Sequence, residues 1–223
     1  MSQPFADRLS ALVEERGPIC AGVDPRAAQL PAGVSPQAWG AQVGELLGGR
    51  VAATKPQLAF FLDEWAGPEA VARASAAGGA LAIADCKRGD IGSTAAAYAP
   101  RILGARSPFA AATLNPYLGR DALEPFVAEA AREGRGVFVL VKTSNPGSSD
   151  LQDVRLEGGG LLCERVASLV DSLGAAHLGP ESGRSLVGAV VGLTAPPDLV
   201  ARLRALMPNA WFLLPGYGAQ GGD

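Results

Sequence analysis

An apolar run leads directly into paired charges in Ala80-Leu81-Ala82-Ile83-Ala84-Asp85-Cys86-Lys87. The first five of these residues predict a buried β-strand. Because side chains alternate along a strand, Asp85 and Lys87 should share one face, while Cys86 should face helices and serve packing only. Burying charges is costly unless they pair or perform chemistry. The strand end is therefore either a structural salt bridge or part of a functional site.

The same pattern recurs outward from this strand in both directions. Apolar runs predict seven strands, near residues 19–23, 51–56, 80–84, 110–114, 136–141, 187–192 and 211–214. The segments between them predict helices near 5–13, 36–47, 68–77, 94–103, 120–133, 161–173 and 196–206. Asp90 or Ser93 is the expected N-cap of the fourth helix.

Alternation of strands and helices at this spacing implies parallel strands with crossover helices. A doubly wound sheet would place its ligand at a topological switch point, whereas a barrel gathers functional residues from many strand ends. Polar or charged residues end six of the seven expected strands, which favours a (β/α)8 TIM barrel. We interpret residues 1–223 as one barrel domain that is C-terminally incomplete, with seven strands present and the eighth missing.

Composition excludes several classes of function. With 48% hydrophobic residues and a net charge of -3, the chain can build a core and has no basic run for nucleic acid. No uninterrupted apolar run reaches the ~18 residues of a membrane span. Three separated cysteines and a single histidine offer no metal-ligand set. Reduced thiols fit a cytoplasmic protein best.

Candidate chemistry gathers at the ends of the predicted strands. Glycine-rich backbone at 216–222, with Gln220, could cradle a phosphate or form a plain loop. Thr143 and Ser144 could close a turn or contact the polar edge of a base or sugar. An alternating-sign set follows the first three strands: Asp24, Lys55, Asp85, Lys87 and Asp90.

Asp85-x-Lys87-x-x-Asp90-Ile91, followed by Thr94, resembles the signature of the orotidine 5'-phosphate decarboxylase family. Its flanking residues are similar to those of the longer bacterial subgroup. Four further segments match in the same order and extend the resemblance over essentially the whole chain: Gly22–Pro25, Lys55–Gln57, Thr143–Pro146 and Pro215–Asp223.

This resemblance implies a homodimeric barrel without metal or cofactor. It would convert orotidine 5'-phosphate to uridine 5'-phosphate and CO2, the last step of de novo pyrimidine synthesis. The catalytic set would be Lys55, Asp85 and Lys87 with the partner subunit's Asp90. Lys87 would donate the proton to C6 of the pyrimidine after CO2 has left.

The resemblance also implies the substrate contacts. Asp24 and Lys55 would reach the ribose hydroxyls, together with Asp90 and Thr94 from the partner. Ile91 from the partner would line the pyrimidine pocket. Ser144 would bond the base, with Thr143 as the alternative. The loop that closes over base and phosphate would contain Pro215 and Gln220, and the eighth strand would supply an arginine to the phosphate.

Two other functions compete with this one. Magnesium-dependent barrels such as 3-keto-L-gulonate 6-phosphate decarboxylase and hexulose phosphate synthase share the Asp-x-Lys-x-x-Asp strand end. Ile91 and the loop at 218–222 favour the orotidylate enzyme instead. A degenerate barrel that binds a nucleotide without turnover is the second alternative, and only the missing end supports it.

Overall fold

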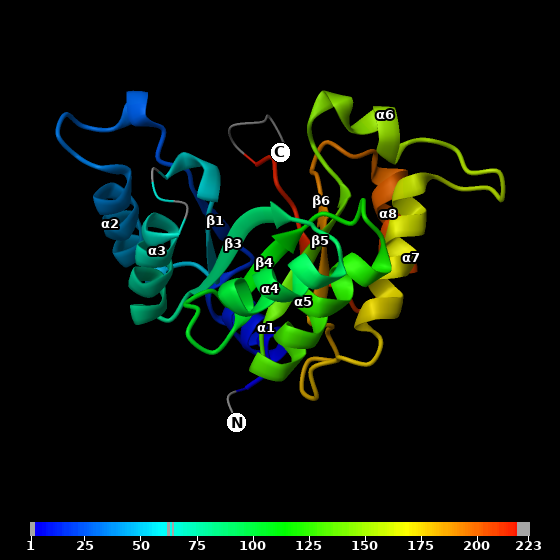
Figure 1. The fold of residues 1–223 in the computed structure, drawn as a ribbon, viewed down its shortest axis with the longest axis horizontal. Coiled ribbons are helices and arrows are strands. Elements are labelled where there is room, and N and C mark those ends of the chain that lie inside the picture. The colour runs from blue at the N-terminus through cyan, green and yellow to red at the C-terminus, as the bar shows by residue number, and fades with distance from the viewer. Residues whose placement is uncertain (1–2, 62, 64, 218–223) are drawn as a thin grey trace.

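A computed structural model describes residues 3–61, 63 and 65–217. Within these residues seven parallel strands form one sheet whose spatial order is the order of the chain, β1 to β7. The sheet curls, with its helices on the convex side (Figure 1). The strands are β1 (Cys20–Val23), β2 (Ala53–Pro56), β3 (Leu81–Arg88), β4 (Ala111–Leu114), β5 (Gly136–Lys142), β6 (Val187–Val191) and β7 (Phe212–Leu213).

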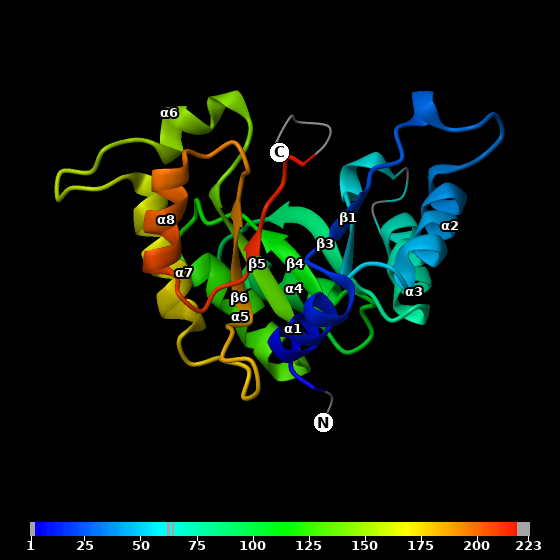
Figure 2. The same ribbon diagram turned by 180° about the vertical axis from the view of Figure 1, so that it is seen from behind.

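Seen from behind, β1 and β7 are the two edges of the curled sheet, and α1 lies across its amino-terminal end (Figure 2). Short 3-10 turns cover Ala27–Gln29, Leu58–Phe60 and Pro146–Ser148. The α-helices are α1 (Phe5–Arg16), α2 (Pro36–Gly48), α3 (Ala66–Ala77), α4 (Gly92–Leu103), α5 (Arg120–Glu133), α6 (Ser149–Gln152), α7 (Leu162–Gly174) and α8 (Pro197–Leu206).

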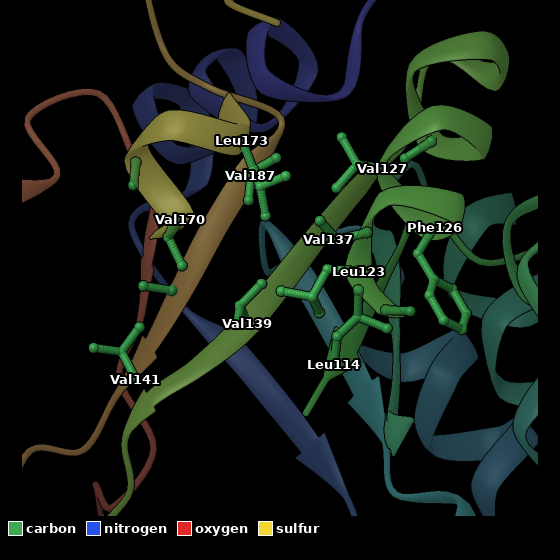
Figure 3. Packing of buried hydrophobic residues seen from close by; sticks show 14 of the residues in the cluster. Leu114, Leu123, Phe126, Val127, Val137, Val139, Val141, Val170, Leu173 and Val187 are labelled. Atoms are coloured by element: carbon green, nitrogen blue, oxygen red, sulfur yellow. The ribbon is translucent and has the colours of Figure 1, made fainter. Parts of the chain in front are cut away.

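An outer core layer lies between the sheet and its helices. Leu114 and Val139 of the sheet face Leu123 and Phe126 of α5, as Figure 3 shows. Cys86 packs against this layer, as expected for a side chain on the helix-facing side of β3. Burying each large apolar side chain contributes about 1.5–3 kcal/mol, so this layer fixes the helices on the sheet.

An inner core layer fills the concave side of the sheet, and α1 closes its lower end. Phe5 of α1 meets Phe138 of β5 edge to face, with ring centroids 6.0 Å apart. Gly136 makes this contact possible, because a Cβ there would lie 2.2 Å from the Phe5 ring. The layer also contains Leu81 and Ile83. A filled lower end leaves the carboxyl ends of the strands as the place for a site.

The predicted parallel strands and (β/α) barrel architecture are confirmed, with seven strands in the described residues. The capping prediction for α4 is wrong. The helix starts at Gly92 rather than at Thr94, Ile91 takes the N-cap position, and no side chain caps it. The Asp90 carboxylate instead accepts a hydrogen bond from the N–H of Ile91. β3 also runs to Arg88, four residues beyond its apolar run, because its charged residues continue the pairing with β4.

Candidate active site

Alternation along the strands brings polar side chains to the inner, carboxyl end of the barrel. Lys55 comes two residues after the inward Ala53 of β2, and Asp85 comes two residues after the inward Ile83 of β3. By the same two-residue period, Thr113 of β4 shares the inner face. Three neighbouring parallel strands therefore deliver a cation, an anion and a hydroxyl to one place.

Asp85 is the centre of this cluster. Lys55 Nζ donates to Asp85 Oδ2 at 2.6 Å, and Lys87 Nζ donates to Asp85 Oδ1 at 2.6 Å. The carboxylate is almost fully buried, whereas 45% of the Lys87 side chain is exposed. A buried anion thus holds an ammonium that remains accessible at the open end of the barrel.

The two lysines decide the protonation of this carboxylate. Burial by itself raises the pKa of Asp85, but the charges and hydrogen bonds of Lys55 and Lys87 outweigh burial and lower that pKa. Burial likewise lowers the pKa of Lys55, and Asp85, with a smaller contribution from Asp24, raises it above its ordinary value. Asp85 and Lys55 are therefore both charged at neutral pH, and Asp24 belongs to the electrostatic surroundings of Lys55.

Thr113 was not singled out from the sequence, where it is one residue of an apolar strand. It is 1% exposed, and its hydroxyl donates to Asp85 Oδ1 at 3.0 Å. The Thr113 hydroxyl oxygen also accepts the backbone N–H of Lys87 at 2.9 Å. Lys87 has a φ of 44°, which makes it the sole positive-φ residue other than glycine in the described chain. A buried threonine thus touches both parts of the charged pair.

Of the expected partner-facing residues, Asp90 and Ile91 lie in the turn between β3 and α4, and Thr94 lies in the first turn of α4. Asp90 and Thr94 are half-buried, and Ile91 is 62% exposed. This turn lies beside the one after β4, because Asn115 N–H donates to the carbonyl of Arg88 at 2.8 Å. Tyr117, also in the second turn, is 76% exposed. The two turns together form an exposed, partly apolar surface next to the charged cluster.

The end of β5 carries the residues expected at the base. The Thr143 hydroxyl donates to Asn145 Oδ1 at 2.7 Å and accepts from Gln152 Nε2 at 2.9 Å. Ser144 lies against Gly192, the residue after β6, where an added Cβ would be 3.0 Å from it. Thr143 is therefore engaged within its own loop, and the assignment of Ser144 to the base stays a prediction.

Beneath this loop Lys142 forms a second lysine–aspartate pair that sequence reasoning missed. Its ammonium bonds both carboxylate oxygens of Asp153, at 2.8 and 2.9 Å, and the Ser148 hydroxyl at 3.0 Å. Pro215, after β7, accepts a backbone hydrogen bond from Leu193. Gln220, the other residue expected in the closing loop, lies outside the described residues.

The cysteines are poor nucleophiles here. Burial raises the pKa of Cys20 to about 11 and also raises the pKa of Cys86, so both are thiols at neutral pH. In the described part of the chain no three His, Cys, Asp or Glu side chains are grouped to hold a metal. Among those residues, too, no helix combines the length and the apolar character needed to cross a bilayer.

Comparison with known proteins gives this geometry a family. The model of the orotidine 5'-phosphate decarboxylase / HUMPS family matches residues 18–223. The chain belongs to this family. A relative from Rhodopirellula baltica, named orotidine 5'-phosphate decarboxylase, is 42% identical over 98% of this chain and 80% of its own length. One from Deinococcus radiodurans, with the same name, is 42% identical over 99% of the chain and 80% of its own length.

A crystal structure from Streptomyces avermitilis covers 100% of this chain and 80% of its own, with a TM-score of 0.87 and 38% identity. The family resemblance carried by Asp85-x-Lys87-x-x-Asp90 is thus confirmed over nearly the whole chain. The roles of the individual site residues stay predictions, and the geometry above supports them to different degrees.

Proposed function

We propose that this protein decarboxylates orotidine 5'-phosphate to uridine 5'-phosphate and CO2, the last step of de novo pyrimidine synthesis. The observation that carries the proposal is the Lys55–Asp85–Lys87 cluster at the carboxyl ends of β2 and β3. Family membership and the two bacterial relatives named for this enzyme support it.

The chemistry of the substrate asks for such a cluster. Loss of CO2 from C6 leaves an electron pair in an sp2 orbital that the pyrimidine ring cannot delocalise. A positioned ammonium stabilises that charge and then supplies the proton. Lys87 fits this role because its side chain is partly exposed while its ammonium is held by a buried carboxylate. The cluster would thus both stabilise the negative charge at C6 and donate the proton. We therefore propose that the reaction needs no cofactor.

The other site residues are assigned by position. Asp24 and Lys55 would contact the ribose, since both lie near Asp85 at the ends of β1 and β2. Ser144 would contact the base. The closing loop would begin at Pro215 and include Gln220. Binding energy from the distant phosphate would be used to close this loop and to hold the charged cluster in place.

We further propose a homodimer in which each site is completed by the partner's Asp90, Ile91 and Thr94. Exposed apolar side chains beside the cluster support this arrangement: Ile91 at 62%, Tyr117 at 76% and Leu118 at 45%. A second copy would cover these side chains and bring a carboxylate to the cluster. The free state of all three cysteines agrees with a cytoplasmic location, which we also propose.

The direct test is loss of the orotate ultraviolet chromophore on adding the purified full-length gene product to orotidine 5'-phosphate. We expect turnover that is unchanged by a chelator. Turnover only of a sugar phosphate, abolished by the chelator and restored by magnesium, would favour the competing barrels. Binding of uridine 5'-phosphate with no turnover of orotidine 5'-phosphate would indicate the degenerate barrel.

A further inference from the structure

Thr113 connects the two members of the charged pair. Its oxygen accepts the N–H of Lys87 at 2.9 Å, so its single hydroxyl proton is directed to Asp85 Oδ1, 3.0 Å away. The ammonium of Lys87 bonds that same oxygen of Asp85. One small side chain therefore fixes both the carboxylate and the backbone from which the ammonium extends.

The backbone at Lys87 needs such support. The pairing of β3 with β4 shifts between Ala84 and Arg88: these residues pair with Ala112 and Leu114, so β3 carries two more residues than its partner. Lys87 lies in this bulge with a φ of 44°. The left-handed conformation is unfavourable for a residue with a Cβ, so it persists only where neighbouring contacts hold it. Because of the extra residues, the Lys87 N–H is out of register with the backbone of β4. It donates instead to the Thr113 hydroxyl.

We propose that Thr113 is a positioning residue for decarboxylation, holding the bulged backbone of Lys87 and the carboxylate of Asp85 in one fixed relation. The inference rests on the proposed function and adds to it a residue that does not touch substrate. Without the hydroxyl, Lys87 loses its backbone acceptor and Asp85 loses one of three donors. The ammonium is then no longer held where the charge at C6 develops.

The decisive variant is Thr113→Val, which keeps the shape of the side chain and removes the hydroxyl. In the full-length protein kcat should fall about 10- to 100-fold while KM changes less than about threefold, as for loss of an interaction that matters in the transition state. Thr113→Ser restores the hydroxyl and should recover kcat to within about threefold of wild type. Thr113→Ala replaces the valine variant if that variant fails to fold.

Thr54→Val is the matched control. Thr54 is a fully buried threonine of the neighbouring strand β2, and its hydroxyl bonds Ser75 Oγ at 2.9 Å, away from the charged cluster. This variant should lose stability comparably and keep the wild-type kcat. A Thr113→Val protein that is folded and has the kcat of the control would overturn the inference, as would a Thr113→Ser protein as impaired as Thr113→Val.

A readout independent of activity separates this inference from the proposed function. In a crystal structure of Thr113→Val, Lys87 should leave the left-handed region and its ammonium should move out of hydrogen-bond distance of Asp85. Retention of both features would overturn the positioning role whether or not the enzyme turns over. Absence of turnover in the wild type would count against the proposed function alone.

Discussion

Two lysine–aspartate pairs lie at the carboxyl ends of β3 and β5, and the buried member is the aspartate in one pair and the lysine in the other. In the first, the Asp85 side chain is 7% exposed and the Lys87 side chain is 45% exposed. In the second, the Lys142 side chain is 7% exposed and the Asp153 side chain is 39% exposed. The first pair keeps the anion inside and presents the cation, whereas the second does the reverse.

This reversal separates a chemical role from a structural one. Lys142 has its ammonium bonded to two carboxylate oxygens and to Ser148, which uses all three of its donors. It anchors the loop that carries Thr143 and Ser144. Lys87 instead extends from a strained backbone and remains partly accessible. A lysine beside an aspartate is therefore a candidate acid only when its ammonium is not saturated by the protein.

The largest effect should come from Lys87→Met, which removes the ammonium and keeps much of the side-chain length. We expect kcat to fall by at least about 10⁴-fold, because general-acid and electrostatic contributions are lost together. The thermal unfolding midpoint should fall by only a few degrees, because Lys55 and Thr113 still bond the buried Asp85 carboxylate. Steady-state kinetics measure the fall in kcat, and calorimetry measures the unfolding midpoint. Turnover within tenfold of wild type would remove Lys87 from the reaction.

The next test asks whether Lys87 and Asp90 act in sites shared between subunits. Lys87→Ala and Asp90→Ala chains, each inactive alone, are mixed under conditions of subunit exchange. Random pairing makes about half of the dimers mixed, each with one intact site, so we expect about a quarter of wild-type activity. No recovery, with exchange confirmed by differently tagged chains, would place both residues in one subunit's site.

Lys142→Met should show the opposite profile to Lys87→Met. It leaves Asp153 and Ser148 without their partner, and the partial exposure of Asp153 limits the cost to about 1–2 kcal/mol of unfolding free energy. We expect kcat within about threefold of wild type and a raised KM, because the loop with Ser144 loosens. Asp150→Asn, an exposed change on the short helix α6, which ends next to Asp153, is the control. A 10³-fold loss of kcat would contradict the structural role.

A third aspartate, the buried Asp7 of α1, extends the comparison to the opposite end of the barrel. Burial raises the pKa of Asp7, but hydrogen bonds from the hydroxyl and N–H of Ser182 and the N–H of Glu181 outweigh burial and lower it. A lowered folded-state pKa contributes stability that is complete above the unfolded-state pKa of about 3.9 and is lost as pH falls through the folded value.

In Asp7→Asn the free energy of unfolding should therefore fall less steeply as the pH is lowered. At pH 7 it should be lower than in the wild type by about 1 kcal/mol. Urea unfolding at a series of pH values measures both. Activity at pH 7 should be unchanged, because Asp7 lies at the amino-terminal end of the strands. An unaltered pH dependence would show that Asp7 is not a source of the acid sensitivity.

Much of this architecture was predictable because local signals agreed with the fold. Helix α5 was expected at 120–133 and begins and ends there. The pairing of Asp85 with Lys87 followed from strand alternation. Where local and tertiary preferences diverge, the sequence was a poor guide. β3 continues through a charged bulge because β4 pairs with it, and Asp90 bonds its own turn rather than capping α4.

Thr113 and Lys142 were missed for a related reason. Each looks ordinary in its own segment, and its role depends on contacts with residues far away in the chain or across a loop. Thr113 reaches Asp85, 28 positions away, and Lys142 reaches Asp153, 11 positions away. Only the register of the sheet and the path of the loop bring these groups together.

The most direct test of Lys87 as the proton donor is exchange of the C6 hydrogen of uridine 5'-phosphate in D2O, followed by NMR. In this exchange the enzyme removes the C6 proton, which is the reverse of the protonation step, and then delivers a deuteron to C6. The measurement therefore needs no decarboxylation. The wild type and Lys142→Met should catalyse the exchange, and Lys87→Met should not. Equal exchange in Lys87→Met and the wild type would contradict the assignment of Lys87 as the acid.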